Sequence, residues 1–221
     1  NRRGPVSFRA LAFTRTLGFR HDSIPDGLAL LTTLSATHDF AVDATEDPTV
    51  FSDAGLAPYR LVIFLLTTGD VLADDQQAAL ERFVTGGGGF VGVHSAADTE
   101  HGWPWYGELV GAWFVNHPPG TATATLHVET HAHPSTAHLG DLWVRTDEWY
   151  NFDHNPRSNV TVLLTIDETT YAGGTMGADH PMSWAHLMGA GRSWYTALGH
   201  TRESYADSAF QAHVLGGILW A

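Results

Sequence analysis

Residues that can carry chemistry follow a short apolar segment near the middle of the chain. The glycines at 86–89 lead into Phe90–Val93, and His94, Ser95 and Asp98 come directly afterwards. In parallel α/β sheets, ligands bind just beyond the carboxyl ends of the strands. An imidazole and a carboxylate at that place can transfer protons or bind a metal ion. We therefore predict that a functional site lies where this apolar segment ends.

Other polar residues also stand at the ends of apolar segments. A parallel sheet would bring all of them to one edge, beside His94. They are Arg20 and His21, residues 67–70, Glu148, Tyr150 and Asn151, and His200. Each residue alone is a weak signal, because single surface histidines are commonly solvated. Their repeated position at strand ends is what favours a shared site.

One interpretation is acid–base chemistry on a sugar. His94 would exchange protons with a carboxylate from Asp98 or Glu148. The chain contains 14 His and 8 Trp, and aromatic rings that carry a polar edge suit a ligand with an apolar ring face and many hydroxyls. The candidates for stacking on a sugar ring are Trp103, Trp105 and Trp149.

A second interpretation is a metal site. Imidazole and carboxylate ligands suit zinc or a similar divalent ion. The candidate ligands are His21, His94, Glu148 and His200. The chain lacks a His-Glu-x-x-His motif, so no local spacing supports this set by itself.

A third interpretation is a serine hydrolase that uses Ser95 as its nucleophile. Residues 93–97 follow the predicted strand as a nucleophile elbow would. The two glycines of the Gly-x-Ser-x-Gly motif are replaced here by Val93 and Ala97, which fit a sharp turn less well. This interpretation therefore ranks below the other two.

Composition excludes several classes of function. The formal net charge is -13 and arginine does not gather in a stripe, which argues against binding to nucleic acid or to an anionic membrane surface. There is no apolar run of about 18 residues, so we expect no membrane span. The absence of Cys removes disulfides and thiolate chemistry. The absence of Lys removes Schiff-base and P-loop chemistry, because both need its amine.

The apolar patterns predict an α/β fold in a single domain that spans residues 1–221. Strands are expected at 6–13, 40–44, 60–66 and 90–93, and helices at 24–37 and 74–85. Crossovers of this length favour a doubly wound, mostly parallel sheet of flavodoxin-like type. From residue 121 onward, extra strands are expected at 121–130, 160–165, 183–187 and 193–198, some of them antiparallel, before a helix at 204–220.

Five separated motifs resemble the ThuA-like family, which is named for trehalose utilisation. They are Gly18–Ile24, Thr67–Asp70, Gly86–His94 with Ala96–Asp98, Asp147–Phe152, and Gly191–Tyr195 with Leu198–Thr201. The family is similar in fold to class I glutamine amidotransferases, which are flavodoxin-like three-layer α/β/α sandwiches. Those enzymes carry a Cys nucleophile on the turn where this chain has His94 and Ser95, so glutamine amidotransfer is excluded.

The resemblance implies a role in carbohydrate metabolism. The positions that match the family's motifs are Arg20, His21, His94, Asp98, Glu148, Tyr150 and His200. The resemblance also implies a secreted bacterial setting, in which such domains belong to larger proteins with neighbouring sugar-active domains. The start of the sequence at Asn1, without Met, agrees with that expectation.

Together these observations predict a carbohydrate-active hydrolase, lyase or isomerase that cleaves or isomerises a saccharide or an oxidised sugar. His94 would be the general base or a metal ligand, and Glu148 its acid partner. Two alternatives stay open: a carbohydrate-binding module without catalysis, and the serine hydrolase. The candidate catalytic residues are His94, Asp98, Glu148, Tyr150 and His200, and the candidate substrate-binding residues are Arg20, Trp103, Trp105, Trp149 and Asn151.

Overall fold

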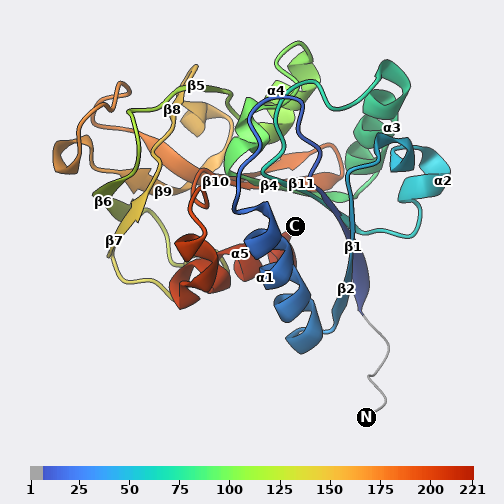
Figure 1. Ribbon diagram of the computed structural model, residues 1–221, viewed down its shortest axis with the longest axis horizontal. Coiled ribbons are helices and arrows are strands. Elements are labelled where there is room, and N and C mark those ends of the chain that lie inside the picture. The colour runs from blue at the N-terminus through green and yellow to red at the C-terminus, as the bar shows by residue number, and fades with distance from the viewer. Residues whose placement is uncertain (1–6) are drawn as a thin grey trace.

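A large sheet carries the fold in the computed structural model, which describes residues 7–221 (Figure 1). Its parallel half consists of β1 (Phe8–Phe13), β2 (Phe40–Thr45), β3 (Leu61–Leu65), β4 (Gly89–Val93) and β11 (Gly191–Thr196). Its antiparallel half consists of β6 (Ala122–Val128), β7 (Leu142–Asp147), β9 (Thr161–Ile166) and β10 (Pro181–Met188). Across the sheet, the strand order is β2-β1-β3-β4-β11-β10-β9-β6-β7.

Helices cover both faces of the parallel half, and this explains why its central strands are uninterrupted apolar runs. Every residue of β3 and of β4 is buried, as expected for strands with a layer on each side. In Figure 1, α1 (Ile24–Thr37) and α5 (Ser208–Trp220) lie on one face. The other face carries α2 (Asp53–Leu56), α3 (Asp74–Thr85) and α4 (Pro104–Val110). The predicted α/β fold class is confirmed.

The antiparallel half ends in β7, a strand that the sequence analysis did not predict. Its inward face carries Trp143, Arg145 and Asp147, whereas Leu142 and Val144 are 55% and 61% exposed. This arrangement reverses the usual pattern, in which apolar residues face inward and polar residues outward. The Arg145 guanidinium lies 5.0 Å from the centre of the Phe210 ring of α5. The inward face of β7 therefore contacts this helix.

Smaller elements complete the chain near the edge of the sheet where the parallel strands end. A second sheet consists of β5 (Phe114–Asn116) and β8 (Asn151–Phe152), which pair antiparallel. A 3₁₀ turn at His94–Asp98 follows β4 without a break. Further 3₁₀ turns lie at Pro48–Val50, Pro156–Ser158, Glu168–Thr170 and Glu203–Ala206.

The structure corrects some predicted boundaries. The first strand was expected from Val6, which lies outside the described residues, and the observed strand begins at Phe8. The helix expected at 204–220 is divided, because the Asp207 carboxylate accepts a hydrogen bond from the Ala209 N–H and starts a new helix at Ser208. Among the described residues, no helix has the length and apolar character needed to cross a lipid bilayer.

Candidate functional site

His94 occupies a strained turn directly after β4. Its φ is 51°, in the left-handed region that a residue with a side chain adopts at a cost of about 1–2 kcal/mol. Two hydrogen bonds hold this turn: the Tyr195 hydroxyl donates to the His94 carbonyl at 2.7 Å, and His94 Nδ1 contacts the Ala197 carbonyl at 2.6 Å. The residue in the strained elbow position is therefore His94, and Ser95 lies one residue beyond it.

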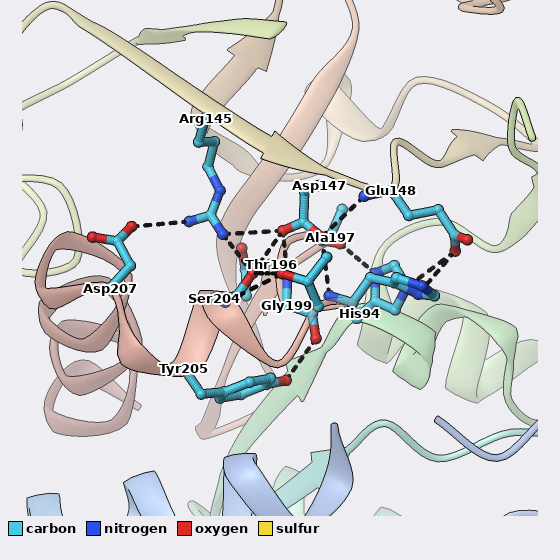
Figure 2. Close-up of polar contacts among 12 residues, drawn as sticks. His94, Arg145, Asp147, Glu148, Thr196, Ala197, Gly199, Ser204, Tyr205 and Asp207 are labelled. Carbon is cyan, nitrogen blue, oxygen red and sulfur yellow. Dashed lines mark hydrogen bonds and ion pairs between the residues drawn. The ribbon is translucent and has the colours of Figure 1, made fainter. Parts of the chain in front are cut away.

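The contact with Ala197 determines which nitrogen of His94 is free. A carbonyl oxygen can only accept, so His94 Nδ1 carries the proton and donates it (Figure 2). When Nδ1 carries the only ring proton, the lone pair of the imidazole lies on Nε2. This atom is buried without a hydrogen-bond partner and lies 3.4 Å from Glu148 Oε1. His94 is thus oriented to present a lone pair beside a carboxylate.

Glu148 lies among three imidazoles. Its Oε1 is 3.4 Å from His94 Nε2 and 3.3 Å from His200 Nδ1, and its Oε2 is 3.5 Å from His117 Nε2. Burial raises the pKa of the Glu148 carboxyl, but contact with His94 and the charges of His200 and His117 outweigh burial and lower that pKa. Glu148 is therefore ionised at neutral pH.

His21 completes a cluster with these residues. Its ring stands edge-on to those of His94 and His200, with centroid distances of 5.1 and 5.0 Å. Burial, followed by the neighbouring imidazoles, lowers the pKa of His21 to about 2. Burial, followed by His94, also lowers the pKa of His200. The His21 ring is therefore neutral at pH 7 and keeps a lone pair for a ligand.

The geometry of the His/Glu cluster (His21, His94, Glu148 and His200) fits a zinc-like ion. One ligand atom from each residue lies within 4.8 Å of all the others. A tetrahedral ion with bonds of about 2.0–2.1 Å separates its ligands by about 3.3–3.4 Å. The distances from Glu148 Oε1 to the His94 and His200 nitrogens are 3.4 and 3.3 Å. The nitrogens His94 Nε2 and His200 Nδ1 are buried and have no hydrogen-bond partner. Each could bind such an ion through its lone pair.

The cluster draws its ligands from both halves of the sheet. His21, His94 and His200 come from loops that follow the parallel strands β1, β4 and β11. Glu148 comes directly after β7, the edge strand of the antiparallel half. The four residues predicted as metal ligands are thus brought together from positions up to 179 residues apart in the sequence.

A comparison with models of protein families tests the resemblance that the five motifs suggested. The model of the trehalose utilisation (ThuA) family matches residues 9–221. The chain belongs to the ThuA family. A search of curated proteins gave no match.

Solved structures share the ThuA fold of this chain. A putative ThuA-like protein from Bacteroides uniformis is 24% identical, with a TM-score of 0.84 over 100% of this chain and 93% of that one. A putative ThuA-like protein from Parabacteroides merdae is 21% identical, with a TM-score of 0.75 over 99% and 90% of the two chains. A β-galactosidase from Bacillus circulans sp. alkalophilus is 15% identical, with a TM-score of 0.56, over 96% of this chain and 30% of that enzyme. At these identities the likeness concerns the fold.

Two charged residues of the ThuA motifs have partners outside the His/Glu cluster. Arg20 donates to Glu46 at 2.7 Å and to the Thr14 carbonyl at 3.1 Å. The Asp98 carboxylate contacts His101 Nε2 at 2.9 Å. Their roles in catalysis and substrate binding stay predictions, because neither residue is held against His94 or Glu148 in this structure.

The predicted substrate-binding tryptophans and Asn151 are largely engaged within the protein. Trp149 is buried, and its indole N–H donates to the Ala122 carbonyl at 2.7 Å. Trp103 and Trp105 are half-buried and stack on each other with a centroid distance of 5.1 Å. Asn151 is buried and uses its side-chain amide within the β5–β8 region. Their roles in substrate binding stay predictions.

Tyr150 is positioned against the cluster by its ring. It lies between His94 and Phe114, with centroid distances of 4.1 and 4.2 Å. Burial raises the pKa of the Tyr150 hydroxyl well above its usual value, so the hydroxyl keeps its proton at neutral pH. Of the predicted catalytic candidates, Tyr150 therefore joins His94, Glu148 and His200 at this place.

Two residues beside the cluster were missed by the sequence analysis. His117 has its Nε2 at 3.5 Å from Glu148 and a side chain that is 35% exposed. Phe19 is 67% exposed, and its ring stands edge-on to His21 at 4.8 Å. Phe19 lies within a family motif, two residues before His21, and this was an available signal. His117 follows a three-residue strand and had no such signal.

Proposed function

We propose that this domain is a metal-dependent carbohydrate-active enzyme that cleaves or isomerises a saccharide or an oxidised sugar. The observation that carries the proposal is the geometry of the His/Glu cluster, in which four ligand atoms lie within 4.8 Å of one another and the buried nitrogens His94 Nε2 and His200 Nδ1 have no hydrogen-bond partner. Membership of a trehalose utilisation family supports a sugar substrate. The predicted secreted, multidomain setting stays a prediction.

His21, His94, Glu148 and His200 would hold a divalent ion such as zinc, because imidazole nitrogens and carboxylate oxygens are zinc ligands. When bound and able to take a fifth ligand, such an ion would supply Lewis-acid polarisation of a sugar oxygen. The hydrogen bond from His94 Nδ1 to Ala197 keeps the Nε2 lone pair directed at this place. The protein therefore contributes a preset ligand geometry.

His117 is the group best placed to move a proton. It is partly exposed, and its Nε2 lies beside the Glu148 oxygen that faces away from His94 and His200. Its Nδ1 lies 2.8 Å from the Pro118 carbonyl and donates to it, so the other nitrogen is free to accept a proton. A group within reach of both solvent and the cluster suits general acid–base work.

The structure offers less support for a serine hydrolase. Ser95 is fully buried, and its hydroxyl lies 3.5 Å from His21 Nδ1, which is at the long limit of a hydrogen bond. The strained elbow conformation belongs to His94. An activated serine needs a closely held base and an exposed hydroxyl.

Metal analysis of the purified protein tests the proposal. We expect about one zinc or similar ion per chain, turnover of at least one member of a panel of disaccharides and their keto derivatives, and loss of turnover with a chelator. Ser95→Ala should keep both metal and turnover. Sugar binding without metal or turnover would instead indicate a binding module, and turnover lost in Ser95→Ala alone would indicate a serine hydrolase.

Phe19 is proposed as the platform for the sugar. An exposed aromatic ring offers an apolar face, and here it stands against a residue of the cluster. Its backbone is held because the Thr68 hydroxyl donates to the Phe19 carbonyl at 2.9 Å. We expect Phe19→Ala to raise KM by about 10-fold, equivalent to about 1.4 kcal/mol, with kcat changed less. Leu17→Ala, which removes another exposed apolar side chain of this loop, is the control and should leave KM near the wild-type value.

A further inference from the structure

We infer that Asp147 is a positioning residue whose carboxylate holds three of the four ligands of the His/Glu cluster in place. This inference rests on the proposed function, since it concerns the metal affinity of that cluster. Asp147 is fully buried at the end of β7, immediately before Glu148. Its carboxylate accepts backbone N–H groups and is not itself one of the proposed metal ligands.

The Asp147 carboxylate binds the two segments that carry Glu148 and His200. Its Oδ1 accepts the Glu148 N–H at 3.0 Å and the His200 N–H at 3.1 Å, and its Oδ2 accepts the Gly199 N–H at 2.9 Å (Figure 2). Hydrogen bonds to a charged acceptor are about twice as strong as neutral ones. One carboxylate thus joins β7 to the loop after β11.

The same loop orients a third ligand. The Ala197 carbonyl, two residues before Gly199, accepts the His94 Nδ1–H at 2.6 Å. Gly199 itself has a φ of 107°, and a Cβ there would lie 2.9 Å from the Tyr205 hydroxyl. The loop therefore has one backbone path, and a shift of this path would move both His94 and His200.

Arg145 balances the buried charge. Its Nη2 donates to Asp147 Oδ2 at 3.1 Å and to the Ser204 hydroxyl at 2.7 Å (Figure 2). Its guanidinium also lies 4.9 Å from the centre of the Trp143 ring and 5.0 Å from that of Phe210. None of these contacts involves a residue of the cluster. A buried ion pair of this kind is weak evidence for stability, and here its geometry points to a role in holding the ligand-bearing loops.

The test measures zinc affinity by competition with a chromogenic chelator and the visible spectrum of the Co²⁺-loaded protein. In Asp147→Asn, an NH₂ group replaces one acceptor oxygen, so at least one of the backbone hydrogen bonds that hold the loop after β11 is lost. We expect zinc affinity to fall by about 10- to 100-fold, as is typical when a ligand's supporting group is removed, and the Co²⁺ bands to change. Asp207→Asn is the control: Asp207 lies 3.7 Å from Arg145 on its other side, and its variant should keep wild-type affinity.

The double variant Arg145→Met/Asp147→Asn controls for misfolding. It removes both buried charges together, so neither is left unpaired in the folded protein. It should be folded by circular dichroism and still show weaker zinc binding and altered Co²⁺ bands. A purely structural role would lower the melting temperature and leave the zinc affinity and Co²⁺ spectrum of the folded protein unchanged, and that result would overturn the inference alone. If the wild-type protein binds no zinc, the proposed function fails and this inference fails with it.

Discussion

Glu148→Gln is expected to lose zinc binding by more than about 100-fold while the protein stays folded. The carboxylate is the one anionic ligand of the His/Glu cluster, and the amide that replaces it has similar size but no charge. Loss of a ligand should exceed the roughly 10- to 100-fold effect of losing a supporting group. Turnover of any sugar substrate should fall in parallel. Elemental analysis and chelator competition measure the first effect, and initial rates measure the second.

A second buried glutamate provides the matched control. Glu100 is 1% exposed and accepts hydrogen bonds from the Leu72 N–H and the Gln77 amide, away from the cluster. Glu100→Gln should lower stability, because its amide has one acceptor oxygen for the two donors that the carboxylate now accepts from. It should keep zinc affinity and turnover. Wild-type zinc affinity in Glu148→Gln would contradict the assignment of Glu148 as a ligand.

Stability is expected to fall as pH drops below about 6.5, because several histidines are buried in neutral form. His213 is fully buried, its Nδ1 donates to the Ser135 carbonyl, and burial lowers its pKa to about 3. Burial also lowers the pKa of His133 to about 4. The unfolded chain binds protons near pH 6.5 while the folded chain does not, so protonation favours unfolding in this range. The His213 contribution is fully present above pH 6.5 and is lost progressively down to about pH 3.

The His213 contribution can be isolated by substitution. Each pH unit between about 6.5 and 3 should cost the wild-type protein about 1.4 kcal/mol through this one group. His213→Gln removes the titrating ring, so its free energy of unfolding should fall less steeply with decreasing pH, by about that amount per unit. Urea unfolding at several pH values between 7.5 and 5 measures the two slopes. Equal slopes would show that His213 is not buried as a neutral ring.

The location of the site was predictable because it follows a general rule of parallel sheets. His21, His94 and His200 each follow an apolar strand of the parallel half, and such strands end at one edge. Glu148 was grouped with them because it also follows an apolar segment, although the antiparallel strand β7 that carries it was not predicted. The positions at strand ends and the family resemblance thus pointed to the same cluster.

The supporting residues were beyond sequence reasoning for a physical reason. Arg145 and Asp147 are charged residues on the buried face of β7, whereas the apolar Leu142 and Val144 are exposed. A pattern search expects the apolar residues to be the buried ones. Arg145 and Asp147 lie two residues apart, but their other partners, the Phe210 ring of α5 and the Gly199 N–H, are distant in the chain. The exposure of Phe19 and the burial of Trp149 were also unpredictable, because both depend on which aromatic rings neighbouring elements cover.

The cluster draws its ligands from both halves of one sheet, so neither half can form it alone. A flavodoxin-like core alone would supply the three imidazoles, whereas the appended strands supply the carboxylate. Truncating or exchanging the appended strands would therefore remove the anion, even if the core folded unchanged. Under the proposed function, a change in the appended strands therefore affects the site as directly as a change in the parallel half.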